Sequence, residues 1–354
     1  MMEEQNRKVL KVSILLPCRN EEKFISTVIE NIIHQDYDSS YIEFLIIDGM
    51  SDDGTRSIID RYQKHFSIIH LVDNPNRTVP HALNIGIKNA TGDLIIRIDA
   101  HAIYPPSYVS TLVYYLDMLG ADNVGGVWET LPSSSSSVAK SIAIALSTPF
   151  GVGNAAYRVN SKPESEYVEV DTVPFGCYRR EVFERIGFFD EDLTRNQDNE
   201  FNERLKKAGG KIYLIPGLSI KYFARENYTK LFKMQYQYGY FGPLVDLKLK
   251  RPTRIRRYVP TIFVLSLIIP LLLVPLDNRF GLISAVSLGL YILLSTFFSL
   301  YELYRRKNML LFPFLTYAYL VSHIGYGIGY IVGIWDFLVM KRHLHKKVDV
   351  ELSR

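Results

Sequence analysis

Three long apolar segments near the C-terminus restrict the fold of this chain more than any other feature. Residues 259–276, 280–301 and 309–335 contain no Asp, Glu, Lys or Arg. A helix needs about 20 apolar residues to cross the hydrocarbon core of a bilayer, and the second and third segments reach that length. We therefore predict a membrane domain at residues 251–354 with two to three hydrophobic helices, and a lipid bilayer as its partner.

The chain before these segments has the character of a cytoplasmic domain. Its first residues, MMEEQNRKVLKV, lack the apolar core of a secretory signal, so residues 1–250 are expected to remain in the cytoplasm. Cys18 and Cys177 lie in no CxxC or Cys/His pattern and are interpreted as packed thiols in a reducing compartment. The net charge of +4 is small, and no nucleic-acid partner is expected.

Basic residues flank the apolar segments on both sides. Those before the first segment are Lys248, Lys250, Arg251, Arg254, Arg256 and Arg257. Such a cluster is typical of a cytoplasmic membrane boundary, although a solvated charge run is the alternative. The third segment is followed by Lys341, Arg342, Lys346 and Lys347. Because basic flanks tend to stay cytoplasmic, we predict a multi-pass or re-entrant cell-membrane protein with an even number of crossings.

Two of the segments are candidates for the one that does not cross. Residues 259–276 are short and interrupted by prolines, which favours a re-entrant or interfacial helix. The third segment contains Gly325, Gly327 and Gly329, a small-residue face suited to close helix packing, and bends back in the alternative arrangement. His323, beside these glycines, is interpreted as packed and hydrogen-bonded rather than functional.

From residue 12 onward, short apolar runs alternate with longer amphipathic ones. The runs VSILLP, IEFLIID, IIHLVDN and DLIIRIDA have the length of strands. Between the first two, Phe24, Val28 and Ile32 recur at four-residue intervals, which indicates a helix. Repeated strand, helix, strand units predict an α/β fold with a Rossmann-like mixed sheet flanked by helices, and ligands of such sheets bind beyond the carboxyl ends of the strands. Residues 131–166 interrupt the pattern, and their five-serine run predicts a flexible loop, either a lid or a segment without function.

Polar residues collect at the predicted carboxyl ends of four strands. They are Pro17, Asn20, Glu21, Asp48, Asp73, Asn74, Asp99 and His101. Asp and Asn at a strand end are more often turn or cap residues than ligands. Because four successive strands share the feature, we predict that one edge of the sheet carries a functional site.

Five motifs, in order, resemble those of the inverting family 2 glycosyltransferases of GT-A fold. LLPCRNEE resembles the family's P-x-x-N-E-E, IIDGMSDDGT its D-D-G-S-x-D-G-T, and ALNIGIKNATGDLIIRIDAHA the strand that carries its D-x-D. RNQDNEFNERLKKAGGKI resembles the E-D helix, and QYQYGYF a glutamine and aromatic segment near the membrane. The resemblance extends from about residue 12 to 250 and includes the membrane-bound enzymes of succinoglycan-type exopolysaccharide synthesis.

The resemblance implies a role for each matching residue. Asp48 would hydrogen-bond the uracil ring of a UDP-sugar, in a nucleotide pocket lined by Pro17, Asn20 and Glu21. Asp99 would lie by the ribose and the metal ion. His101 would occupy the metal-binding D-x-D position, where the family has a second Asp. Two further positions depart from the family pattern, because Gly49 stands where Asp is frequent and Gln197 replaces the Glu of E-D.

Asp198 would be the catalytic base, and the chemistry of the residues agrees with that role. Inversion needs one carboxylate to deprotonate the acceptor hydroxyl as it attacks the anomeric carbon. Asp198 in a first helical turn is alternatively an acidic residue favoured by the helix dipole. A divalent cation, Mn²⁺ or Mg²⁺, held by Asp99 and His101 would neutralise charge developing on the diphosphate leaving group.

Three further candidates come from the residues themselves. Arg97 and Asp99 point to the same face of a strand, so Arg97 could add a positive charge near the phosphates, with an ion pair beneath the loop as an equal alternative. Arg77 is a candidate for a phosphate contact. Asn84 is a candidate for support of the nucleotide pocket, whereas His81 is interpreted as structural.

These observations predict a membrane-anchored, metal-dependent inverting glycosyltransferase. We expect it to transfer a sugar, glucose from UDP-glucose, to a polyprenyl-linked acceptor at the cytoplasmic face, and the resemblance leaves room for partners in a polysaccharide-synthesis assembly. One alternative is a polyprenyl-phosphate monosaccharide synthase. Another, of a different class, is an inactive nucleotide-sugar-binding scaffold of a membrane assembly.

Overall fold

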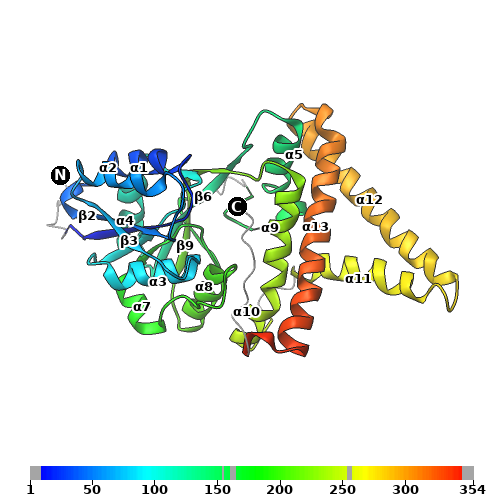
Figure 1. The fold of residues 1–354 in the computed structure, drawn as a ribbon. Coiled ribbons are helices and arrows are strands. Elements are labelled where there is room, and N and C mark those ends of the chain that lie inside the picture. Colours follow the sequence, from blue (N-terminus) through cyan, green and yellow to red (C-terminus); the bar gives the residue numbers. More distant parts are fainter. Residues whose placement is uncertain (1–8, 154, 160–164, 253–256, 345–354) are drawn as a thin grey trace. The chain divides into compact units, whose positions relative to one another are not determined.

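The computed structural model describes residues 9–153, 155–159, 165–252 and 257–344, which form two compact units (Figure 1). Unit 1 comprises residues 1–129 and 161–222, and unit 2 comprises residues 130–160 and 223–354. The first unit contains the sheet and the second is helical. The boundary between a catalytic and a membrane domain at residue 250 stays a prediction.

Unit 1 is built on a mixed nine-stranded sheet, which confirms the predicted α/β class. Its order is β3-β2-β1-β4-β8-β6-β9-β5, with β7 paired to β9. The first four strands in the chain are parallel neighbours: β1 (Val12–Cys18), β2 (Ile42–Asp48), β3 (Ile69–Asp73) and β4 (Leu94–Arg97). The remaining strands are β5 (Ala102–Ile103), β6 (Asn123–Leu131), β7 (Val168–Glu169), β8 (Cys177–Arg179) and β9 (Ile212–Phe223).

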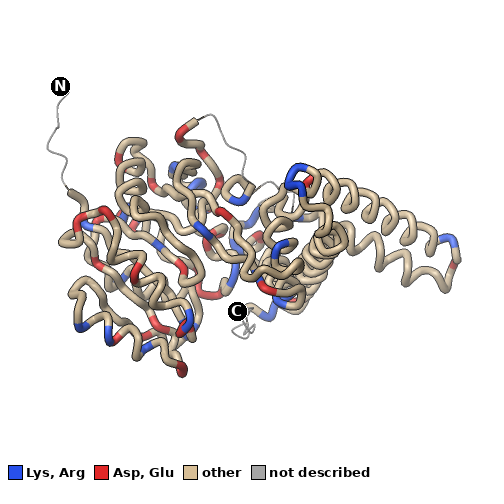
Figure 2. The backbone as a smooth tube through the Cα atoms, turned by 90° about the horizontal axis from the view of Figure 1, so that it is seen from above, with Lys and Arg blue, Asp and Glu red and all other residues tan. Residues whose placement is uncertain are grey.

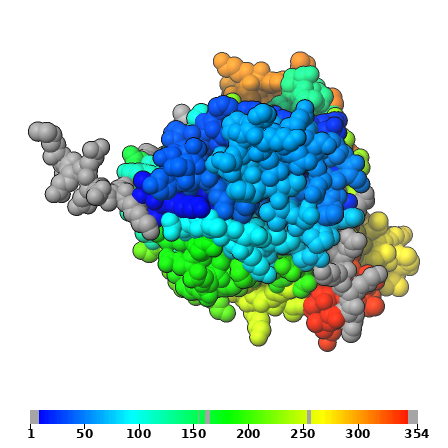
Figure 3. Space-filling view, turned by 60° about the vertical axis from the view of Figure 1, so that its left-hand side comes forward, coloured from blue at the N-terminus to red at the C-terminus, as the bar shows by residue number. Residues whose placement is uncertain are grey.

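Helices cover both faces of this sheet because its central strands are apolar on both sides. All seven residues of β1 are buried, as expected of a central parallel strand. Figure 1 shows α1 (Ile25–Ile33) and α2 (Thr55–Gln63) over one face, and α3 (Val79–Asn89), α7 (Arg180–Ile186) and α8 (Gln197–Lys207) over the other. Unit 1 also contains α4 (Tyr108–Met118) and the 3-10 turn Ser39–Tyr41. In the space-filling view of Figure 3, the blue and cyan N-terminal part of the chain forms most of the visible face.

The expected helix after the first strand is α1. It buries Ile25, Val28, Ile29 and Ile32, the spacing of one helical face. Phe24 lies just before the helix and is exposed. Cys177 is a packed thiol as predicted, and its burial raises the pKa of the sulfhydryl.

Unit 2 is made of helices from two separate parts of the chain. The first part contributes α5 (Ser137–Ala145) and α6 (Pro149–Val152), and the second begins with α9 (Tyr228–Tyr240) and α10 (Gly242–Leu249). The apolar segments form α11 (Tyr258–Leu273), α12 (Arg279–Arg305) and α13 (Phe312–Ile334), followed by a π-helical turn, Trp335–Val339. Short 3-10 turns span Met309–Leu311 and Arg342–Leu344. Residues 279–305 and 309–339 are long and apolar enough to be candidate membrane spans, and α11 is shorter.

The five-serine run is an exposed loop at residues 133–136, as predicted, but much of the rest of the segment 131–166 is helical. Ser136 caps α5, because its side chain accepts a hydrogen bond from the backbone N–H of Ala139. Ile142 and Leu146 of this helix are buried in a hydrophobic cluster with Leu315 of α13. A serine run therefore supplies a helix cap here, and the apolar residues that follow provide the packing. Residues 154 and 160–164 lie outside the described part.

The predicted close packing of the glycine face of α13 is confirmed. A Cβ atom built on Gly329 would lie 2.1 Å from the carbonyl oxygen of Tyr236 in α9, and one on Gly333 would lie 2.2 Å from that of Tyr240. The backbones of α9 and α13 therefore approach more closely than they could if a residue with a Cβ atom stood at position 329 or 333. His323 is packed and hydrogen-bonded, as predicted, since its Nε2 donates to the carbonyl oxygen of Phe150 at 2.9 Å.

Candidate active site

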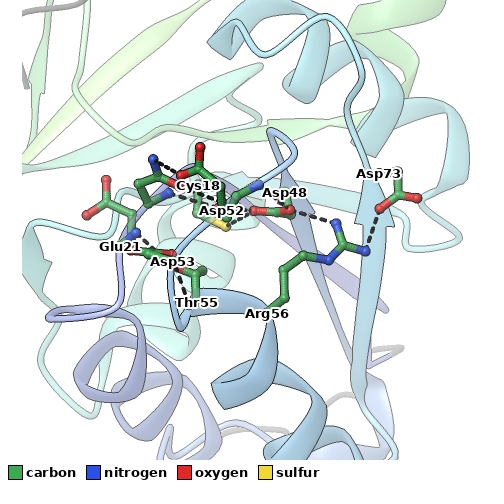
Figure 4. A network of polar contacts seen from close by, with 10 residues as sticks. Cys18, Glu21, Asp48, Asp52, Asp53, Thr55, Arg56 and Asp73 are labelled. Carbon is green, nitrogen blue, oxygen red and sulfur yellow. Dashed lines mark hydrogen bonds and ion pairs between the residues drawn. The ribbon is translucent and has the colours of Figure 1, made fainter.

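The carboxylate of Asp48 is the centre of a hydrogen-bonded network at the carboxyl ends of β1, β2 and β3 (Figure 4). It is fully buried and accepts hydrogen bonds from the backbone N–H and the hydroxyl of Ser51, at 3.0 and 2.5 Å, and from Arg56 at 2.7 Å. The thiol of Cys18 lies 3.9 Å from the same carboxylate. Arg56 extends to Asp73 at 2.8 Å, so one guanidinium joins the ends of two strands.

Arg56 was not identified from the sequence. It occupies the first turn of α2, directly after the Asp-rich loop, and hydrogen bonds to Asp73 and Asp48 raise the pKa of its guanidinium. The sequence position of Arg56 could have indicated this role, because a basic residue in the first turn of a helix that follows such a loop can reach carboxylates at two neighbouring strand ends. Because its carboxylate already has these partners, Asp48 would have to exchange one of them to contact a nucleobase directly.

The loops after β1 and β2 hold each other in place. The side-chain amide of Asn20 donates to Asp52 at 2.8 Å, and its carbonyl oxygen accepts from the backbone N–H of Asp52 at 3.0 Å. The backbone N–H of Glu21 donates to the hydroxyl of Thr55 at 2.8 Å. Asn20 has a φ of 56°, a left-handed conformation that Asn tolerates better than most residues. The structure thus brings Pro17, Asn20 and Glu21 together with the loop that follows Asp48.

His101 is oriented by Glu21, a residue predicted only as part of the nucleotide pocket. Nε2 of His101 lies 3.1 Å from the Glu21 carboxylate, which is buried, and the ring contacts Phe24 edge-on at 4.5 Å between centroids. A hydrogen bond to the Glu21 carboxylate requires the proton on Nε2, and that tautomer leaves Nδ1 as the nitrogen available to a ligand. The backbone N–H of His101 donates to Asp99 at 3.0 Å, which links the two predicted metal ligands.

A metal ion at this position would need ligands from outside the protein. The described residues contain no group of three or more His, Cys, Asp and Glu side chains arranged to hold a metal. Asp99 and His101 nevertheless supply an oxygen and a nitrogen donor two residues apart at the end of β4. This pair fits a divalent cation whose remaining ligands come from phosphate oxygens and water.

Arg97 forms an ion pair with Asp198 rather than standing free at the strand end. Its Nη1 donates to Oδ1 of Asp198, which lies in the first turn of α8. Burial alone would lower the pKa of Arg97, but the adjacent carboxylate of Asp198 raises it above the ordinary value. The Asp198 side chain is 32% exposed, whereas that of Arg97 is 11% exposed. The arginine therefore holds the carboxylate from below and leaves part of it accessible.

Asn84 and His81 join α3 to the segment before α8. The amide of Asn84 donates to the carbonyl oxygen of Phe189 and to Glu191, both at 2.9 Å, and accepts from the backbone N–H of Phe189. Nε2 of His81 lies 3.2 Å from Glu191. These contacts agree with the structural interpretation of His81 and connect Asn84 to the segment before α8, while support of the nucleotide pocket by Asn84 stays a prediction. Arg77 lies on an exposed turn with a φ of 62°.

Comparison with known proteins places this arrangement in a family. Residues 13–187 match the family described as Glycosyl transferase family 2. A Methanococcus voltae protein named dolichyl N-acetyl-alpha-D-glucosaminyl phosphate 3-beta-D-2,3-diacetamido-2,3-dideoxy-beta-D-glucuronosyltransferase is 32% identical over 237 residues, which are 64% of this chain and 71% of that protein. Succinoglycan biosynthesis protein ExoA of Rhizobium meliloti is 32% identical over 228 residues, which are 64% of this chain and 67% of that protein.

Solved structures show the same fold at lower sequence identity. The mannosyltransferase PcManGT from Pyrobaculum calidifontis, in complex with GDP-Man and Mn²⁺, has a TM-score of 0.59 and 19% identity, covering 93% of this chain and 88% of that one. S. aureus TarS 1-349 in complex with UDP-GlcNAc has a TM-score of 0.51 and 15% identity, covering 91% and 90%. Both are similar to this chain in fold. Together with the sequence matches, they identify the chain as a member of glycosyl transferase family 2 with the GT-A fold.

Proposed function

We propose that this chain is a membrane-anchored, metal-dependent inverting glycosyltransferase that moves glucose from UDP-glucose to a polyprenyl-linked acceptor. The observation that carries the proposal is the partly exposed Asp198 carboxylate, held by the buried Arg97 at the end of β4, just before Asp99 and His101. One carboxylate presented in this way provides the single base that inversion requires. The name of the Methanococcus voltae relative supports a lipid-linked acceptor, since it describes a dolichyl phosphate-linked sugar, and the name of the Rhizobium meliloti relative supports a role in polysaccharide synthesis.

In the proposed reaction, Asp198 takes the proton of the acceptor hydroxyl. The hydroxyl oxygen then forms its bond to the anomeric carbon on the face opposite the nucleotide, and UDP leaves with the electron pair of the broken bond. Arg97 fixes the orientation of the carboxylate through its hydrogen bond, so the base does not have to be ordered at the moment of reaction.

The nucleotide is proposed to bind at the loops after β1 and β2. Asn20, Glu21 and Asp48 belong to a hydrogen-bonded network that joins the two loops, and Pro17 lies beside it in β1; a site held in place by such contacts has a lower ordering cost on binding. Arg77, on its exposed turn, is proposed to reach a phosphate. Asp99 and His101 would hold the divalent cation, which supplies positive charge to the diphosphate leaving group.

Purified full-length protein in detergent tests the proposal. We expect UDP release from UDP-glucose in the presence of Mn²⁺ and a polyprenyl-linked acceptor from a membrane lipid extract, and no release with Asp198→Asn. A product with the sugar attached directly to lipid phosphate would instead identify a polyprenyl-phosphate monosaccharide synthase. Binding of UDP-glucose without turnover, with every acceptor fraction of the extract, would identify an inactive scaffold and overturn the proposal.

A further inference from the structure

The carboxylate of Glu21 is buried, whereas most acidic residues described in unit 1 are at least partly exposed. Figure 2 shows acidic residues at many points along the backbone of this unit, but Glu21 is only 3% exposed. A buried carboxylate is stable only when hydrogen-bond donors or an opposite charge compensate for the loss of water. Asp48 and Glu200, two other buried carboxylates of the unit, are each paired with an arginine. The contacts of Glu21 therefore indicate what its carboxylate does.

A histidine ring, that of His101, lies against the Glu21 carboxylate. Its Nε2, the ring nitrogen farther from the main chain, is 3.1 Å from each of the two carboxylate oxygens. The ring also packs edge-on against Phe24, with 4.5 Å between the ring centroids. Because the His101 side chain is 19% exposed, these contacts hold most of the ring and leave part of it accessible.

The second ring nitrogen, Nδ1, is the one nearer the main chain of His101. The backbone N–H of the same residue donates to Oδ1 of Asp99 at 3.0 Å, so the Asp99 carboxylate lies beside that main chain. Because Nε2 is occupied at the far end of the ring, the nitrogen left to accept a ligand is the one closer to Asp99. The contact with Glu21 thus selects the nitrogen that can share a cation with Asp99.

The main chain of Glu21 is itself held at both of its polar groups. Its carbonyl oxygen accepts hydrogen bonds from the backbone N–H groups of Phe24 and Ile25, at 2.9 and 2.8 Å, where α1 begins. Its N–H donates to the hydroxyl of Thr55 at 2.8 Å, and that hydroxyl donates to Asp53 at 2.5 Å. A supporting group must be rigid to orient another side chain, and Glu21 meets this requirement.

We propose that Glu21 is a positioning residue that acts through His101: it fixes the ring so that Nδ1 is the nitrogen offered to the divalent cation, and it does not itself contact the nucleotide. Burial supports this role, because a residue that is 3% exposed has almost no surface to offer to a nucleotide. Groups that orient a ligating histidine typically contribute about 10–100-fold to metal affinity. The inference rests on the proposed metal-dependent function and changes the role that the sequence motif predicts for Glu21.

Two binding measurements on the full-length protein in detergent separate this role from a nucleotide contact. Calorimetry in EDTA gives the Kd for UDP without metal, and electron paramagnetic resonance of free Mn²⁺ at saturating UDP gives the Kd for the metal. Glu21→Met keeps the length of the side chain and removes both acceptor oxygens, whereas Glu21→Gln retains one. We expect the Kd for Mn²⁺ to rise about 10–100-fold in Glu21→Met and less in Glu21→Gln, with the Kd for UDP in EDTA unchanged in both.

Matched variants provide the controls. Glu22→Met changes the neighbouring glutamate, which is exposed, and should leave both affinities unchanged. Asp48→Ala should give the opposite pattern, with weaker UDP binding in EDTA. In a His101→Ala background, Glu21→Met should cause no further loss of Mn²⁺ affinity, because a positioning residue has no effect without the group that it positions. Fluorescence of the buried Trp128 checks that each variant is folded.

Either of two results would overturn the inference alone. An equal Kd for Mn²⁺ in Glu21→Met and the unsubstituted protein would show that Glu21 does not act through His101. A higher Kd for UDP in EDTA, in folded Glu21→Met, would show that the carboxylate contacts the nucleotide. If Glu21→Met does not fold, Glu21→Gln decides the same question, since its Kd for Mn²⁺ should still exceed that of the unsubstituted protein.

A third result separates the inference from the proposed function. If the unsubstituted protein binds UDP but takes up no Mn²⁺ with it, the metal dependence of the proposed function fails together with the inference. The other two results leave that metal dependence intact.

Discussion

The ion pair between Arg97 and Asp198 should be measurable as a coupling energy. In Asp198→Asn, the guanidinium of Arg97 loses its charged partner while its Nε is already buried without a hydrogen-bond partner among the described residues. Breaking a fully buried pair costs about 3–5 kcal/mol. Because Asp198 is 32% exposed and partly screened by solvent, we expect about 2 kcal/mol for either Asp198→Asn or Arg97→Met.

The double variant separates the energy of the ion pair from the effects of the two single substitutions. With both charges removed, Arg97→Met/Asp198→Asn should be no less stable than the weaker single variant, which corresponds to a coupling energy of about 2 kcal/mol. For a unit of this size, each single change should lower the apparent Tm by about 4–8 °C. Fluorescence of the buried Trp128 in unit 1 reports the transition in detergent, and UDP release reports turnover, which should be lost in all three variants.

An exposed pair in the same unit provides the control. Lys206 lies 3.7 Å from Glu169, and both side chains are at least one-third exposed (35% and 56%). The cycle of Lys206→Met and Glu169→Gln should give a coupling of less than about 1 kcal/mol. If the stability losses at Arg97 and Asp198 simply add, or if the control pair couples as strongly, then the buried ion pair does not hold the carboxylate and this reasoning fails.

Three further outcomes follow from the same contacts. Asp48→Ala should weaken UDP binding in calorimetry by tenfold or more, about 1.4 kcal/mol, with turnover of bound donor less affected; unchanged affinity would exclude the network from the nucleotide site. His101→Ala should raise the Mn²⁺ concentration needed for half-maximal UDP-sugar binding, whereas His101→Asp should need about the same concentration as the unsubstituted protein. If His101→Ala also needs the same Mn²⁺ concentration as the unsubstituted protein, His101 is not part of the metal site. Gly329→Ala should destabilise unit 2 by about 2 kcal/mol or more, because the new Cβ would lie 2.1 Å from the Tyr236 carbonyl oxygen, while Gly289→Ala, with nothing within 4 Å, should be neutral or stabilising; equal Tm values for the two would refute the close packing.

Much of unit 1 could be predicted from the sequence because its signals are local. Apolar runs of strand length separated by helical periodicity were sufficient for an α/β sheet, and each strand end followed from where a run stopped. The motifs around Asp48, Asp99 and Asp198 were readable for the same reason, since each lies within a few residues of a strand or helix end.

The partners of those residues were decided only by the tertiary structure. Arg97 and Asp198 are far apart in the chain, and local patterns do not determine whether a charged strand residue meets a ligand or another side chain. Arg56 joins Asp48 and Asp73 only because β2 and β3 are neighbours in the sheet.

In unit 2 the difference between what the sequence predicts and what the tertiary structure decides is larger. Hydropathy alone identified three apolar segments, but it treats α12 and α13 alike because it averages over all faces of a helix. Which residues of α13 are buried depends in part on α5 and α9, which come from earlier parts of the chain. The apolar residues after the serine run form a helix there, and α13 offers that helix an apolar surface. The sequence by itself determined that these segments are apolar, and only the tertiary structure decided which of their side chains are buried against other helices of unit 2.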